Sequence, residues 1–201
     1  MSLITMPSTP AFSASTWTIK RAVASSRSPF SGHEQVYEYS MACWQATVTL
    51  PPMKRDQAGA WQAFFLKLRG RANTFLMGDP DGKSLLAGTG NIPTSASVVG
   101  SDAIGQTSVN INMTPNSKQF KAGDYIQFGT GAASQLHMIV ADKTGDGEIT
   151  IEPELKVAIS SSTTVTLSNT KAVMRMDSND LGWDADHVSK YGFSFSCTEA
   201  I

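Results

Sequence analysis

One alternating stretch limits the possible folds of this chain more than any other feature. From Ala42 to Leu50 every second residue is apolar, and Gln45, Thr47 and Thr49 occupy alternate positions. A period of two places one face of an extended strand in a core and the other in solvent. Pro51-Pro52 ends the pattern, because proline has no N–H to donate to a sheet. We therefore expect residues 34–50 to form a long antiparallel strand.

The next segment has the period of a helix. Its apolar residues follow the i, i+3, i+4, i+7 stripe of an amphipathic helix: Trp61, Phe64, Phe65 and Leu68. Asp56 is the expected N-cap, and Gly70 is the expected residue beyond the last turn. We expect this to be the one long helix of the chain.

The rest of the chain predicts strands. Residues 11–23 and 72–77 have strand composition, and residues 25–32 are rich in turn formers. After residue 88 come short apolar segments separated by turn signals, which is typical of a small barrel or sandwich. Among these turns, residues 144–147 contain Asp-Gly, which favours a hairpin. The last segment alternates Tyr191, Phe193 and Phe195 with small residues, so we expect it to pair with the N-terminal strands.

The charge balance excludes bulk attraction to nucleic acid or to an anionic membrane. The chain has 16 basic and 17 acidic residues, and only 16% of its residues are charged. Cys43 and Cys197 are expected to be buried thiols, with a disulfide as the less favoured alternative. The sequence shows no signal peptide and no apolar run long enough for a membrane span, so we expect a cytoplasmic protein or a particle assembled there.

No catalytic, cofactor-binding or metal-binding constellation is expected. His33-Glu34 lacks the second histidine of a zinc helix, and His137 and His187 have no ligand-type residue at a suitable spacing. The segment from Asp142 to Gly147 resembles the start of an EF-hand loop, but its twelfth position is Pro153. Asp184 and Asp186 form a carboxylate pair without apolar surroundings to raise a pKa. We predict a non-enzymatic protein without a cofactor.

Three aromatic residues are candidates for contacts with other subunits. Trp183 stands in a polar loop, where it would anchor a sugar or a partner subunit, or else pack between two domains. Phe12 lies in the N-terminal segment and Phe30 in a loop, and contact with a partner would order both segments. We take Phe12, Phe30 and Trp183 as the predicted assembly interface.

The order of these segments resembles that of a known family. The runs Tyr39–Met53 and Trp61–Gly70 are similar to the N-terminal domain of siphophage tail-tip proteins, in which a long strand ends at prolines and leads into one helix. The runs Lys121–Phe128, His137–Val140 and Ile149–Leu155 are similar to the barrel inserted in those proteins. The chain as a whole looks like the two-domain distal tail protein of these phages.

This resemblance implies a mainly β fold. Residues 1–90 and 175–201 would form a β-sandwich domain with one α-helix, interrupted by a small barrel like the oligonucleotide/oligosaccharide-binding fold at residues 91–174. It implies a homohexameric ring in the virion, at the distal end of the tail tube, which contacts the tube protein and a tail-tip hub or fibre protein. DNA would pass through the lumen without specific binding. The barrel has no arginine and only three aromatics, Phe120, Tyr125 and Phe128, which departs from a nucleic-acid stacking platform.

Two other functions remain open at this point. A carbohydrate-binding module for host recognition would contact sugar through Trp183. A cell-wall hydrolase subunit would depend on an acidic side chain such as Asp184, and we expect no such activity. The leading hypothesis is that the protein is a structural tail or baseplate adaptor, which works through contacts between subunits.

Overall fold

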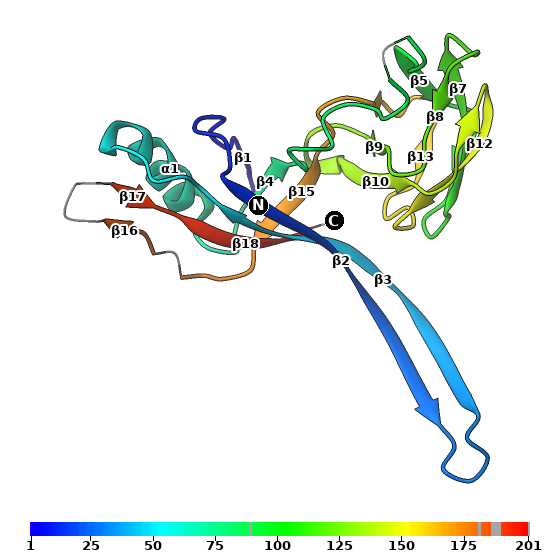
Figure 1. Cartoon of the computed structure of the whole chain (residues 1–201), viewed down its shortest axis with the longest axis horizontal. Helices are drawn as coiled ribbons and strands as arrows, with labels where there is room; N and C mark the ends of the chain where they lie inside the picture. The colour runs from blue at the N-terminus through cyan, green and yellow to red at the C-terminus, as the bar shows by residue number, and fades with distance from the viewer. Residues whose placement is uncertain (89, 181, 186–189, 201) are drawn as a thin grey trace.

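The computed structural model describes residues 1–88, 90–180, 182–185 and 190–200. The chain is mainly β, with one α-helix and two six-stranded sheets, the second of which is nearly closed into a barrel. The predicted fold class is therefore confirmed (Figure 1). No helix in these residues is long and apolar enough to cross a membrane.

The first sheet, here called the platform sheet, combines the two ends of the chain. Its strand order is β1-β4-β15-β18-β3-β2, and only the β1–β4 pair is parallel. β15 already begins at Ala172 and pairs with β4 and β18, so residues 172–174 of the predicted insert lie in this sheet. The strands of the platform sheet are β1 (Leu3–Ile4), β2 (Ala14–Arg27), β3 (Glu34–Thr49), β4 (Thr74–Met77), β15 (Ala172–Met176) and β18 (Ser194–Glu199).

Helix α1 (Arg55–Leu68) covers one face of the platform sheet. The predicted stripe is confirmed, since Trp61, Phe64, Phe65 and Leu68 are all buried against residues of β3, β4 and β18. The N-cap prediction is wrong, because the cap is Lys54 rather than Asp56, and Lys54 makes no side-chain cap hydrogen bond. The backbone of Met53 exchanges two hydrogen bonds with Tyr191, of 3.0 and 2.9 Å, so the chain stays extended up to that point and turns into the helix directly afterwards.

The second sheet, here called the barrel sheet, has the order β14-β9-β10-β12-β7-β5. Its edge strands β14 and β5 lie next to each other, which nearly closes the sheet. Alternate residues of its strands, such as Val109, Ile111, Ile149 and Ile151, fill a separate core. The strands are β5 (Ser95–Val98), β7 (Ser108–Thr114), β9 (Tyr125–Phe128), β10 (Gln135–Ile139), β12 (Gly147–Glu152) and β14 (Val165–Thr166).

Three short strand pairs complete the fold, together with the 3-10 turn Gly131–Ala133: β6 (Ser101–Asp102) with β13 (Ile159–Ser160), β8 (Gln119–Phe120) with β11 (Lys143–Thr144), and β16 (Asp184–Ala185) with β17 (Tyr191–Gly192). The hairpin predicted at residues 144–147 is wrong, because β11 and β12, on either side of this turn, pair with other strands. Asp146 instead accepts a 2.7 Å hydrogen bond from the backbone N–H of Met113 on β7.

The barrel is joined to the platform sheet by buried contacts. Trp44 of β3 donates its indole N–H to the carbonyl oxygen of Leu136 at 2.7 Å, and the Leu136 side chain belongs to the platform core. The buried Glu199 carboxylate pairs with the Lys156 ammonium group and also accepts the backbone N–H of Trp44 at 3.0 Å. These contacts hold the two sheets in a fixed relation.

Candidate interaction surfaces

The long hairpin of β2 and β3 is the most unusual feature of the molecule. The two strands are paired from Ala14–Thr49 to Arg27–Glu34, but β18 covers only Gln45–Thr49 of β3. Residues 21–41, here called the arm, extend away from the body as a two-stranded ribbon (Figure 1). None of them is buried. An isolated two-stranded hairpin is marginally stable at best in water, so the arm adds little to the stability of the single chain.

A bulge marks the point where the arm leaves the sheet. Ala42 lies opposite Arg21, whereas Tyr39 lies opposite Ala22, so Ser40 and Met41 are extra residues on β3. An insertion of this kind bends the strand and strengthens its twist. The arm therefore departs from the plane of the platform sheet at a position that is set by the sequence.

The two faces of the arm differ in chemistry. Residues directly opposite on an antiparallel pair share a face. One face, here called the tyrosine face, is uncharged and consists of Ala22, Ala24, Ser26, Gln35, Tyr37 and Tyr39. Tyr37 and Tyr39 are 53% and 60% exposed, and Gln35 donates a 2.6 Å hydrogen bond to the Tyr37 hydroxyl. Arg27, Glu34 and Glu38 lie on the opposite face, so aromatic side chains and charges are segregated as they are at protein interfaces.

The tip of the arm is a closed loop that presents one aromatic ring. The backbone N–H groups of Ser28 and Gly32 donate to the carbonyl oxygens of His33 and Ser28, at 2.9 and 3.0 Å. The Arg27 side chain adds a 3.2 Å hydrogen bond to the carbonyl oxygen of Gly32. Phe30 lies within this loop and is 98% exposed, so its ring contacts almost nothing in its own chain.

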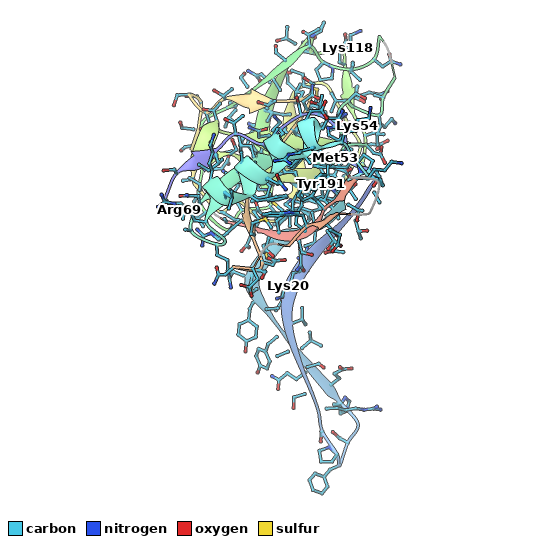
Figure 2. The ribbon with its side chains drawn as sticks, turned by 90° about the vertical axis from the view of Figure 1, so that its left-hand side faces the viewer. Lys20, Met53, Lys54, Arg69, Lys118 and Tyr191 are labelled. Atoms are coloured by element: carbon cyan, nitrogen blue, oxygen red, sulfur yellow. The ribbon has the colours of Figure 1, made fainter. Side chains whose placement is uncertain are left out.

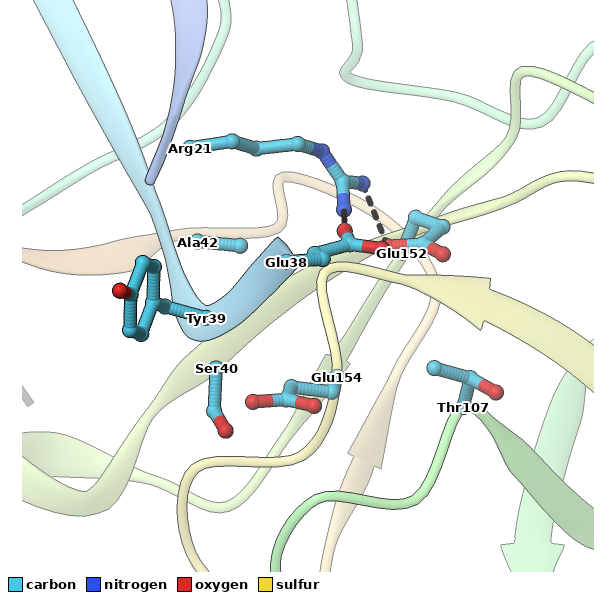
Figure 3. Close-up of a pocket in the computed structure, with 8 residues that line it drawn as sticks. All are labelled: Arg21, Glu38, Tyr39, Ser40, Ala42, Thr107, Glu152 and Glu154. Carbon is cyan, nitrogen blue, oxygen red and sulfur yellow. Dashed lines mark hydrogen bonds and ion pairs between the residues drawn. The ribbon is translucent and has the colours of Figure 1, made fainter. Parts of the chain in front are cut away.

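The base of the arm is tied to the barrel by one guanidinium group. Arg21 donates to Glu38 at 3.1 Å and to Glu152 of β12 at 2.6 Å (Figure 3). The hydrogen bond with Glu152 is the main cause that raises the pKa of Arg21, so the group stays charged. A cavity of 290 Å³ lies beside this group, with Tyr39, Thr107 and Glu154 among its walls. The contact links the direction of the arm to the position of the barrel.

The platform sheet carries a second uncharged surface on the side away from the helix. Cross-strand neighbours on β2, β3 and β18 present small hydroxyl side chains there, such as the 3.0 Å pair of Thr47 and Ser196. This hydroxyl face consists of Thr16, Thr18, Gln45, Thr47, Thr49, Ser194, Ser196 and Thr198. Along β2 the same alternation continues through Lys20 into the tyrosine face.

The structure does not bring the three predicted interface residues together. Phe12 precedes β2 and is half-buried, with its ring centroid 6.2 Å from that of Trp61. Phe30 lies at the tip of the arm, and Trp183 is 41% exposed with its ring centroid 6.5 Å from that of Phe193. Phe12 therefore contributes to the core of the protein, while Phe30 and Trp183 remain accessible at separate places.

Phe12 also forms a wall of a half-open, mainly apolar pocket of 240 Å³, here called the N-terminal pocket. The pocket lies where residues 6–12 pass the end of β4, and its apolar walls are Met6, Pro7, Pro10, Phe12, Met77 and Pro80. Charged groups of both signs stand at its edge, among them Asp79, Lys83 and Lys171. Figure 2 shows the side chains of the body and of the arm together.

The titratable groups singled out from the sequence have structural partners. His137 is completely buried, and its Nδ1 atom lies 2.6 Å from the carbonyl oxygen of Pro153. Burial lowers the pKa of His137 to about 4, so the ring is neutral near pH 7. The EF-hand-like carboxylate of Asp142 pairs instead with Lys121 at 2.7 Å, which lowers the pKa of Asp142.

No group of three potential ligand residues that could hold a metal ion occurs in the part of the chain that the structure describes. His187 and Asp186 lie outside the described residues. Cys197 is buried, as predicted, and burial raises the pKa of its thiol, whereas Cys43 is only half-buried and both cysteines are free. The non-enzymatic assignment stays a prediction.

Sequence reasoning missed the arm and its tyrosine face. Residues 34–41 read Glu-Gln-Val-Tyr-Glu-Tyr-Ser-Met, and their apolar members do not keep the strict alternation of residues 42–50. That loss of alternation is the signal that marks where the strand leaves the core.

No protein-family model and no curated protein matches this chain.

Proposed function

We propose that this protein is a structural subunit that forms a ring at the distal end of the tail tube of a long-tailed phage and joins the tube to tip or fibre proteins. The sequence order and the fold support the proposal, and the arm carries it. The order of segments in the sequence resembles that of siphophage distal tail proteins, and the fold combines a helix-covered β-sheet with an inserted barrel. The protein would act in the virion, after assembly in the host cytoplasm.

The arm is the observation that carries the proposal. A monomer gains little buried surface from residues 21–41, since no side chain among them is fully buried. Such an element suits a subunit that repeats around an axis, because each copy then presents one surface that fits a different surface of the next copy.

The uncharged faces suit a channel for DNA. Cationic side chains that contact phosphates produce most of the non-specific affinity of proteins for DNA. The eight residues of the hydroxyl face include no lysine or arginine, with Lys20 on β2 and Arg175 on β15 as the cations at its margins, and the whole chain has a formal net charge of −1. A ring that presents this face to its lumen would let DNA pass without holding it.

The barrel would project from the ring. Its aromatic residues are not available for stacking, because Phe120 and Phe128 are fully buried and the Tyr125 hydroxyl donates a 3.0 Å hydrogen bond to Asp79. The barrel therefore supports contacts with a tip hub or fibre protein better than it supports binding of a nucleic acid or a sugar.

Native mass spectrometry and negative-stain imaging of the purified chain test the proposal. We expect closed rings, with a hexamer as the species that the resemblance implies. The matched variant replaces residues 22–41 by Asn-Gly, a pair that closes tight hairpins, next to the Arg21–Ala42 pair. Because the arm contributes no buried side chain, this variant should fold and stay monomeric. A wild-type protein that is monomeric at every concentration would contradict the self-assembling ring.

One observation favours carbohydrate binding as a second candidate. Trp183 borders a shallow cavity of 240 Å³ together with Arg69 and Asn179, and an exposed indole beside planar polar groups suits the stacking face of a sugar. Glycan-array binding that disappears with Trp183→Ala, in a protein that does not form rings, would favour this candidate over the adaptor.

A further inference from the structure

The tip of the arm presents an exposed aromatic ring, and the body has an apolar pocket that the same chain does not fill. Phe30 is 98% exposed at the far end of the arm, while the pocket lies in the body between residues 6–12 and the end of β4. Figure 1 shows the tip of the arm far from the N-terminal segment, so the ring of Phe30 cannot reach the pocket of its own chain. A contact between them requires two molecules.

The size and chemistry of the pocket fit a phenyl ring. Apolar cavities of about 150 Å³ accept benzene in other proteins. The N-terminal pocket has 240 Å³ and is open to solvent on one side, so a ring carried by another molecule can enter it. Its walls include two methionines, and methionine adapts its shape to aromatic partners.

The tip loop is already ordered for insertion. Its two backbone hydrogen bonds and the contact between Arg27 and Gly32 close the turn, and Pro29 precedes the exposed ring. Binding by a preorganised loop loses less conformational entropy than binding by a flexible one. These contacts thus hold the backbone around the exposed phenyl ring in one turn.

The charges around the two surfaces also match. Glu34 follows the tip loop, and Lys83 and Lys171 stand at the edge of the pocket. Arg27, on the other strand, carries the charge opposite to that of Asp79, which also lines the pocket. Neither Arg27 nor Glu34 forms an ion pair within the residues described, so both remain available for the complementary charges of a partner.

We propose that Phe30 of one copy inserts into the N-terminal pocket of a second copy, and that this contact sets the head-to-tail order of the subunits. Phe30, Tyr37 and Tyr39 together offer about 400 Å² of exposed aromatic surface, taking about 200 Å² for each full side chain. This is about half of the roughly 800 Å² that each partner contributes to a standard interface. A second copy is the occupant because the tip and the pocket then both find a partner in every subunit.

The inference rests on the proposed function, and disulfide trapping tests it separately. Two variants are prepared in a Cys43→Ser background, one with Ser31→Cys beside Phe30 and one with Ser8→Cys at the exposed edge of the pocket. We expect the mixture to form a disulfide-linked dimer under mild oxidation. Ser117→Cys, on an exposed loop of the barrel, replaces Ser8→Cys in the control mixture and should give no such dimer.

Phe30→Ala, added to the Ser31→Cys variant, should reduce the trapped dimer at least tenfold. In the otherwise unchanged chain the same substitution should weaken self-association by about thirtyfold or more, the range of interface hot spots. Trapping no greater than in the control mixture, or unaffected by Phe30→Ala, would overturn the inference. Wild-type rings without trapping would refute only this contact, whereas trapping without closed rings would refute only the ring.

Discussion

Acid should destabilise this protein through one buried histidine. His137 is completely buried on β10 with Nδ1 next to the Pro153 carbonyl oxygen, and Nε2 has no hydrogen-bond partner among the described residues. Burial lowers its pKa from 6.5 to about 4, and the nearby Lys156 charge acts in the same direction. The unfolded chain therefore binds a proton at a higher pH than the folded chain does. The stability that the neutral ring contributes is fully present above pH 6.5 and is lost as the pH falls from 6.5 towards 4.

The size of the effect follows from these two pKa values. Each pH unit in that window changes the free energy of unfolding by about 1.4 kcal/mol. Between pH 7 and pH 5 the folded protein should lose about 2 kcal/mol from this group alone, and by pH 4 about 3 kcal/mol. A loss of this size is a substantial share of the total stability of a typical domain.

Urea unfolding followed by tryptophan fluorescence at pH 7 and pH 5 measures the effect. His137→Gln removes the titrating group, so the difference between the two pH values should shrink by about 2 kcal/mol, even though the variant is less stable at pH 7. His33→Gln is the matched control for the histidine-to-glutamine change, because His33 is exposed at the arm tip and lies outside both cores. An equal pH dependence in wild type and His137→Gln would refute the reasoning, because it would mean that His137 accepts its proton in the folded state.

Three further outcomes are expected. Trp44→Phe should lower the free energy of unfolding by about 1–3 kcal/mol in a urea titration, because it leaves the buried Leu136 carbonyl oxygen without its donor. Arg21→Gln should lower the free energy of unfolding by less than about 1 kcal/mol, since the ion pairs at the base of the arm are partly exposed. Hydrogen exchange in residues 22–41 should nevertheless become faster, and unchanged exchange would show that Arg21 does not hold the arm. The variant without an arm should act as a cap when mixed with wild-type protein, because it can accept a neighbour and cannot donate to one, so native mass spectrometry should show open assemblies in place of rings.

The core elements could be predicted because burial imposes a period on the sequence. Trp44, Ala46 and Val48 face a core on a strand, and Trp61, Phe64 and Phe65 face the same core on a helix. Each set repeats with the geometry of its element, so the residues that fill the core are visible without coordinates. The same reasoning identified β18, whose Phe195 is buried between small residues.

The arm and its attachment could not be predicted in this way. No core faces residues 34–41, so nothing requires their side chains to alternate, and a strand with two exposed faces looks like an irregular segment. Arg21 and Glu152 are 131 positions apart, and neither has a neighbour in sequence that points to the other. Asp146 was expected to close a hairpin because of the glycine that follows it, but its carboxylate accepts a hydrogen bond from the backbone N–H of Met113 on β7.

The arm has features that limit pairing of its edge strands with other strands, and it keeps the tyrosine face accessible. β2 is an edge strand of 14 residues, and such edges tend to pair with any other exposed strand. The bulge at Arg21 and the charges of Arg27 and Glu38 are devices that limit this kind of pairing. They leave the tyrosine face and Phe30 uncharged and accessible, although a monomer gains no stability from exposing them. In the proposed head-to-tail assembly, an arm with charges on one face and an uncharged opposite face would favour one mode of contact over the others, and a repeated assembly depends on that selectivity.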